Sequence, residues 1–163
     1  MAKHLNAYRT LVTELSAVLL LTGITAIAQT QQEHVHDMSH GVMPFDMNRS
    51  IHVFKMTESG GIQRVIVKDR ADAGQITLIR QHLREEAGRF QRGDYSDPAD
   101  LHGATMPGLS ELQHGAERVR VAYADLVDGG EITFRTLDLH LLTAIHRWFG
   151  AQLSEHGADA RAE

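Results

Sequence analysis

The chain has 163 residues, enough for one domain with its own core, and its 42% hydrophobic and 23% charged residues are typical of a globular protein. A formal net charge of −5 argues against nucleic-acid binding, which usually requires a basic surface. The absence of cysteine excludes disulfides, thiolate metal sites and covalent c-type haem, whereas eleven histidines are unusually many.

The N-terminal segment, residues 1–28, has the pattern of a signal peptide. Lys3 and Arg9 precede a short apolar stretch over 15–24, and Ala26-Ile27-Ala28 matches an A-x-A cleavage site. The apolar stretch is shorter than the roughly 20 residues that span a bilayer. We therefore expect a periplasmic or secreted protein with no stable membrane insertion after signal cleavage. An amphipathic helix retained in the mature protein is the alternative.

The next segment, residues 29–48, is rich in His, Met, Gln, Asp and Ser and has no apolar periodicity. This pattern predicts a flexible His/Met-rich arm. We expect one folded domain over residues 49–158 and a disordered tail over 159–163.

Within this domain the sequence predicts two β-hairpins, each followed by a helix. The β-forming segments separated by Gly-containing turns are 50–56, 62–68, 118–124 and 131–136. Asp72 and Asp138, which are 66 residues apart, are predicted helix N-caps, and apolar stripes follow both. A short helix is predicted over Leu109–His114, after a long linker over 93–108.

These elements indicate an α+β fold in which two ββα repeats share one antiparallel four-stranded sheet. Neither hairpin-plus-helix unit can bury its apolar faces alone, so we expect both helices to pack on the same face of the sheet.

The arm contains the densest group of candidate metal ligands. They are His34, His36, Met38, His40 and Met43. Imidazole nitrogens suit Cu(II), Zn and Ni, and thioether sulfur suits Cu(I), so a His/Met mixture without cysteine is typical of copper binding in an oxidising compartment. The alternative is a solvated linker with only adventitious metal affinity.

The domain contains further candidates. His52 lies on the first predicted strand, His102 and Met106 lie in the linker, and His146 is on the last helix beside aromatic residues. These four could form a second metal site. His102 and His146 could instead hold a non-covalent haem.

Three other histidines have ordinary structural explanations. The spacing of His82 and Glu86 on the first helix predicts a surface ion pair. His114 and His156 lie near predicted helix ends, where a cation interacts favourably with the helix dipole.

Enzyme motifs are scarce: G-x-S-x-G, H-E-x-x-H and a Gly-rich loop ending in G-K-[ST] are all missing. The first hypothesis is therefore an exported copper-binding protein in transport, storage or resistance, with a metal ion and another periplasmic protein as partners. The second is a binding module for a small organic ligand or haem. A transferase-type enzyme is third.

Several segments carry a resemblance. They are 43–46, 52–54, 60–65, His102-Gly103, 106–109 and 145–149. Over 43–158 the chain resembles a group of small exported bacterial proteins of uncharacterised function, some of which carry the name aspartate carbamoyltransferase. The chain lacks the S-T-R-T phosphate-binding signature of that enzyme. The resemblance implies export and a shared small fold.

Overall fold

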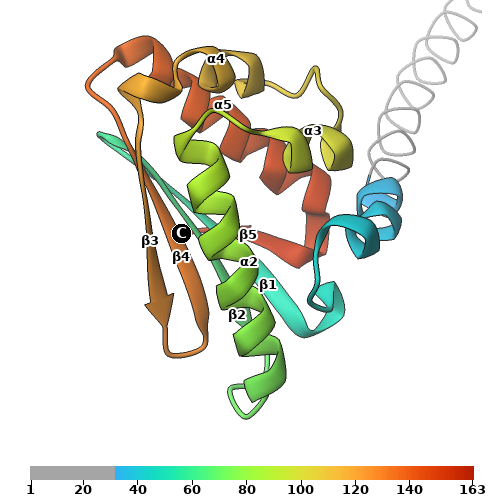
Figure 1. The fold of residues 1–163 in the computed structure, drawn as a ribbon. Helices are drawn as coiled ribbons and strands as arrows, with labels where there is room; N and C mark the ends of the chain where they lie inside the picture. The colour runs from blue at the N-terminus through green and yellow to red at the C-terminus, as the bar shows by residue number, and fades with distance from the viewer. Residues whose placement is uncertain (1–31) are drawn as a thin grey trace, which may run out of the picture.

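The computed structural model describes residues 32–163, so the predicted signal peptide over 1–28 lies outside the described residues. Five strands form one sheet in the order β3-β4-β2-β1-β5 (Figure 1). They are β1 (Ser50–Thr57), β2 (Gly60–Val67), β3 (Arg120–Leu126), β4 (Gly129–Arg135) and β5 (Ala160–Ala162). The neighbours β1–β2, β2–β4 and β3–β4 are antiparallel, and β5 pairs parallel to β1.

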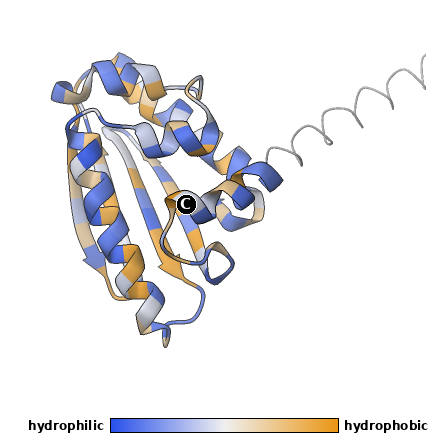
Figure 2. Cartoon of the chain, turned by 45° about the vertical axis from the view of Figure 1, so that its right-hand side comes forward, coloured by the Kyte–Doolittle hydropathy of each residue, from blue (hydrophilic) through white to orange (hydrophobic). Residues whose placement is uncertain are grey.

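Two long helices cover one face of this sheet. They are α2 (Ala73–Gln91) and α5 (Leu139–His156), and the side chains of Asp72 and Asp138 cap their first turns as the sequence predicts. Each helix packs mainly on the hairpin of the other half: α2 lies against β3 and β4, and α5 against β1 and β2. Hydrophobic positions recur between hydrophilic ones along α2 (Figure 2), and the two helices share one core with the sheet.

Two glycines allow this close approach of helix to sheet. A Cβ on Gly61 would lie 2.4 Å from the ring of Phe149, and a Cβ on Gly130 would lie 3.0 Å from Leu83. Gly61 and Gly130 each lie at the second position of a central strand, so the same device serves both halves of the sheet.

The segment between the hairpins contains two short helices, α3 (Ser96–His102) and α4 (Leu109–His114). The second is the helix that the sequence predicts, but α3 falls within the predicted linker. Its short polar sequence has no apolar periodicity to identify it; Pro98 and Leu101 nevertheless bury their side chains. Short 3₁₀ turns complete the described chain: η1 (Met47–Arg49), η2 (Ala116–Arg118) and η3 (Gly157–Asp159).

The sheet differs from the predicted four-stranded antiparallel one because the C-terminal residues add β5. Backbone pairing of Ala160 with His52 and of Ala162 with Phe54 makes the sheet five-stranded and mixed. The tail expected over 159–163 has too little β-forming sequence to reveal a strand. Backbone pairing with the edge of β1 stabilises this strand, which the sequence of the tail alone does not predict.

The expected arm over 29–48 also differs in its described part. Residues 32–42 are helical, and Val35, Phe45 and Met47 are buried. Only a few apolar side chains anchor this segment, which is too few to produce a periodic pattern. Among the helices of residues 32–163, none is long and apolar enough to cross a membrane.

This packing makes a prediction about stability. Replacing Phe45 with Ala should lower the free energy of unfolding by about 3–5 kcal/mol, because a buried aromatic side chain leaves a cavity. Met38→Ala is the matched control, since Met38 is 43% exposed, and it should change stability by less than about 0.5 kcal/mol. Urea unfolding of both variants makes the comparison. Equal stability of the two would show that the segment before β1 does not pack on the domain.

Candidate functional site

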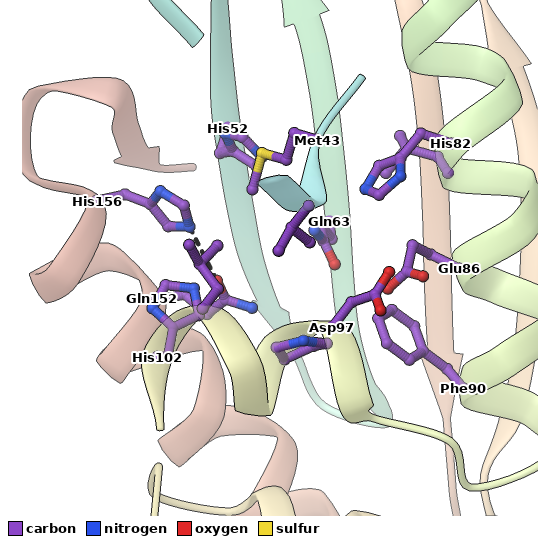
Figure 3. A pocket seen from close by; sticks show the side chains of 14 residues that line it. Met43, His52, Gln63, His82, Glu86, Phe90, Asp97, His102, Gln152 and His156 are labelled. Atoms are coloured by element: carbon purple, nitrogen blue, oxygen red, sulfur yellow. Dashed lines mark hydrogen bonds between the residues drawn. The ribbon is translucent and has the colours of Figure 1, made fainter. Parts of the chain in front are cut away.

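A small cavity of about 40 Å³ lies between the sheet and the helices, beside the end of the N-terminal segment. Its lining is strongly polar for a position next to the core (Figure 3). One end, here called the imidazole end, consists of Met43, His52, His102, Gln152 and His156. The other, here called the carboxyl end, consists of His82, Glu86 and Asp97.

Separate elements bring the three histidines of the imidazole end together. His52 is on β1, on the same side as Phe54, while His102 and His156 are the last residues of α3 and α5. The ring centroids of His52 and His156 are 4.7 Å apart, and those of His102 and His156 are 4.9 Å apart. His52 and His156 are buried, and the side chain of His102 is only 1% exposed.

Each of these three rings uses one nitrogen in a hydrogen bond. His156 Nε2 lies 3.1 Å from Gln152 Oε1, His102 Nδ1 lies 2.8 Å from Glu155 Oε2, and His52 bonds to the backbone of Asp159. The partners are oxygen acceptors, so the ring N–H groups donate, and this assigns the tautomers. For His52 and His156, Nδ1 is then the nitrogen that remains outside these bonds.

Two of these remaining nitrogens have no partner. Nδ1 of His52 and Nδ1 of His156 are buried and lack a hydrogen-bond partner within the part of the chain that the structure describes, as does Oε1 of Gln63 in the same cavity. A buried polar atom without a partner costs about 1–3 kcal/mol, so each such atom calls for a bound group or a role that accounts for it.

Burial keeps the paired rings uncharged. Loss of hydration, together with the neighbouring His82 and His102, lowers the pKa of His52 from 6.5 to about 3. Burial also lowers the pKa of His156 well below its usual value, with His52 and His102 adding to the effect. Both imidazoles are therefore neutral at physiological pH and keep the lone pairs that metal coordination requires.

The carboxyl end holds a proton. Burial and the adjacent Asp97 carboxylate raise the pKa of Glu86 from 4.5 to about 8, and the two side chains share a hydrogen bond. Arg89 pairs with both carboxyl groups from the exposed side. Burial also lowers the pKa of His82. This differs from the predicted surface ion pair of His82 and Glu86, because Glu86 is buried and its partners are Asp97 and Arg89.

The structure brings together three of the candidate ligands: Met43, His52 and His102 all line the cavity. Two others lie elsewhere. Met106 is buried in the hydrophobic core, and His146 Nε2 lies 3.0 Å from the Thr57 carbonyl and 2.9 Å from that of Gly60. His146 thus fastens α5 to the turn between β1 and β2.

The remaining candidates are on the helix over 32–42. His34, Met38 and His40 are exposed, and His36 is half-buried with its Nδ1 3.4 Å from Asp159 Oδ2. The ring centroids of His36 and His40, one turn apart, are separated by 6.0 Å. These side chains lie outside the lining of the cavity.

Sequence reasoning did not select His156, Gln152 or the carboxyl end. The signal was weak, because His156 precedes a glycine at a helix end, where a dipole interaction is a sufficient explanation. One pattern did contain information: Gln152 and His156 are four residues apart, the spacing that places side chains on one helix face.

Within residues 32–163, no group of three or more His, Cys, Asp or Glu side chains is placed to hold a metal ion. Comparison with known proteins adds no assignment: the chain matches no protein-family model, and neither curated proteins nor solved structures give a match. The site must therefore be interpreted from its own chemistry.

The proton at the carboxyl end predicts a pH effect. Between about pH 4.5 and pH 8, Glu86 holds a proton in the folded state but has lost it in the unfolded chain. Glu86 therefore makes the free energy of unfolding fall as pH rises through this range. Glu86→Gln keeps a donor toward Asp97 but cannot ionise. The free energy of unfolding of this variant, relative to that of the wild type, should therefore rise by a few kcal/mol from pH 5 to pH 9.

Urea unfolding at both pH values measures this gain. Glu85→Gln, at the exposed neighbouring position, is the control and should give the same difference from wild type at both pH values. If the free energy of unfolding of Glu86→Gln differs from that of the wild type by the same amount at pH 5 and at pH 9, the protonated carboxyl pair is contradicted.

Proposed function

We propose that this protein binds a single copper ion, as Cu(I), at the imidazole end of the cavity, and that it works as an exported copper-binding protein in transport, storage or resistance. The observation that carries the proposal is the pair of buried, neutral and unpartnered nitrogens, His52 Nδ1 and His156 Nδ1. Export rests on the predicted signal peptide over 1–28.

The surroundings of the histidines support coordination. Imidazole ligands in metal sites usually donate their second N–H to a carbonyl or carboxylate, which fixes the ring and its tautomer. His52, His102 and His156 each make a bond of this kind, to a backbone group, a carboxylate and an amide oxygen respectively.

The spacing also suits a shared ion. With metal–nitrogen bonds of about 2.0 Å, ring centroids on one tetrahedral ion lie roughly 5 Å apart. The observed 4.7 and 4.9 Å are close to this value, although the rings of His52 and His156 are stacked, with 13° between their planes. Coordination by both rings therefore requires them to rotate out of the stack, and this rotation also shifts their hydrogen bonds to Gln152 and to the backbone of Asp159.

The donor set favours Cu(I). Met43 contributes a thioether from the same end of the cavity (Figure 3), and thioether sulfur prefers Cu(I) to Zn²⁺. Neutral ligands in a buried site also leave the charge of the ion uncompensated, which costs less for a monovalent ion than for a divalent one.

The size of the cavity argues against the alternative ligands. About 40 Å³ accommodates an ion, whereas pockets for small organic molecules are typically about 300–1,000 Å³. The haem hypothesis with His102 and His146 is weakened further, because the two side chains form hydrogen bonds in different parts of the fold: His102 with Glu155, and His146 with the carbonyl of Thr57.

Two substitutions test the copper site. His156→Gln removes a proposed ligand and should weaken Cu(I) binding by about 100-fold or more, beyond the 10–100-fold typical of outer-shell changes. Met43→Leu keeps the side-chain volume and should weaken Cu(I) binding while leaving Zn²⁺ binding unchanged. Competition with a coloured Cu(I) chelator measures both affinities.

The chain offers matched controls. His114→Gln changes an exposed histidine, and Met106→Leu changes a core methionine that the sequence also favours as a ligand. Both should bind Cu(I) as the wild type does, and circular dichroism checks that all four variants fold. The copper proposal fails if folded His156→Gln protein binds as tightly as the wild type.

We also propose that the two hairpin–helix units are an internal repeat related by an approximate two-fold axis. The register between the central strands supports this, because Gly61 lies opposite Phe134 and Gly130 lies opposite Val65. Gly61 and Gly130 are 69 residues apart, and so are Val65 and Phe134. The two pairs therefore occupy equivalent positions in the two halves.

A further inference from the structure

A second feature involving histidines lies on the surface, directly outside the cavity. The helix over 32–42, the end of α5 and η3 enclose an open recess of about 360 Å³. His36, Asp37 and Asp159 contribute polar side chains to it.

One side chain belongs to both places. His156 lines this recess and also the buried cavity, so this residue lies between them. Asp159 connects them as well: its carboxylate approaches His36 in the recess, and its backbone bonds to His52 in the cavity. His156 and Asp159 therefore lie between the polar side chains of the recess and those of the cavity.

We propose that the recess is an entry site for copper, where His36 and Asp159 first bind the ion and His156 passes it to the cavity. This inference rests on the proposed function and adds a second, weaker metal site and a route between the two.

The outer donors suit a transient site. His36 Nδ1 and Asp159 Oδ2 are 3.4 Å apart, close enough to share an ion after a small adjustment, and His40 lies one helical turn away. The carboxylates of Asp37 and Asp159 attract a cation. Lys68, with its Nζ 3.7 Å from Asp159 Oδ1, opposes this attraction and helps to keep the site weak.

The inner site also needs a route. His52 is 2% exposed and His156 is 6% exposed, so an ion in solvent has little direct access to either ring. His156 is the last residue of α5. In the proposed route its side chain rotates between the recess and the cavity, giving up its hydrogen bond to Gln152 as it does so.

The test separates the rate of copper uptake from the final affinity. The full-length mature protein receives Cu(I) from a coloured chelator complex in a stopped-flow instrument, and loss of the chelator absorbance gives the transfer rate. The double variant His36→Gln/His40→Gln should slow transfer by about tenfold, while equilibrium affinity changes by less than about threefold. The matched control is His114→Gln/His140→Gln, which also removes two exposed histidines and should transfer at the wild-type rate.

A third variant, Asp159→Asn, removes the outer carboxylate but keeps the backbone that His52 contacts, and it should slow transfer in the same way. Wild-type transfer rates in both recess variants would overturn the entry site while leaving the copper site intact. A loss of affinity as large as the loss of rate would also overturn it, because His36 would then hold the final ion. If the wild-type protein takes no copper from the chelator and His156→Gln changes nothing, the copper site and its entry site both fail.

Discussion

The stacked contact between His52 and His156 is the constraint on which the rest of the site depends. Two imidazoles with ring centroids 4.7 Å apart cannot both carry charge in a buried position, so the fold keeps them neutral. One nitrogen of each ring bonds to an oxygen acceptor, and Nδ1 of each ring has no hydrogen-bond partner within the described residues. The copper ion proposed above would accept these lone pairs and so remove the cost of leaving them unpaired.

The architecture explains why the site lies where it does. Each long helix crosses to the hairpin of the other half, which leaves the N-terminal end of β1 beside the last turn of α5. The helix α3 and the segment over 32–47 cover this end. The cavity is therefore built from parts of the chain that lie far apart in the sequence, and no short motif could contain all of its lining residues.

The regular part of the fold was predictable because its signals are local. The caps Asp72 and Asp138 and the apolar stripes after them locate α2 and α5 directly. The fifth strand was not predictable, because Ala160 and Ala162 become a strand only through pairing with β1. The helix over 32–42 and α3 escape notice for a similar reason: a few buried anchors hold them, and periodicity does not arise from so few residues.

The candidate site was partly predictable. Residue chemistry selected Met43, His52 and His102, which line the cavity, but it also selected Met106 and His146, which serve the core and a turn. Composition identifies the type of donor, whereas only the fold decides which donors meet.

The most direct measurement is the position of copper in a crystal of the Cu(I)-loaded protein, from anomalous scattering at the copper absorption edge. A copper ion held by the buried histidines gives one dominant peak at the imidazole end of the cavity, within bonding distance of His156 Nδ1. A copper peak found only on the exposed histidines of the helix over 32–42, or no ordered copper at all, would contradict it.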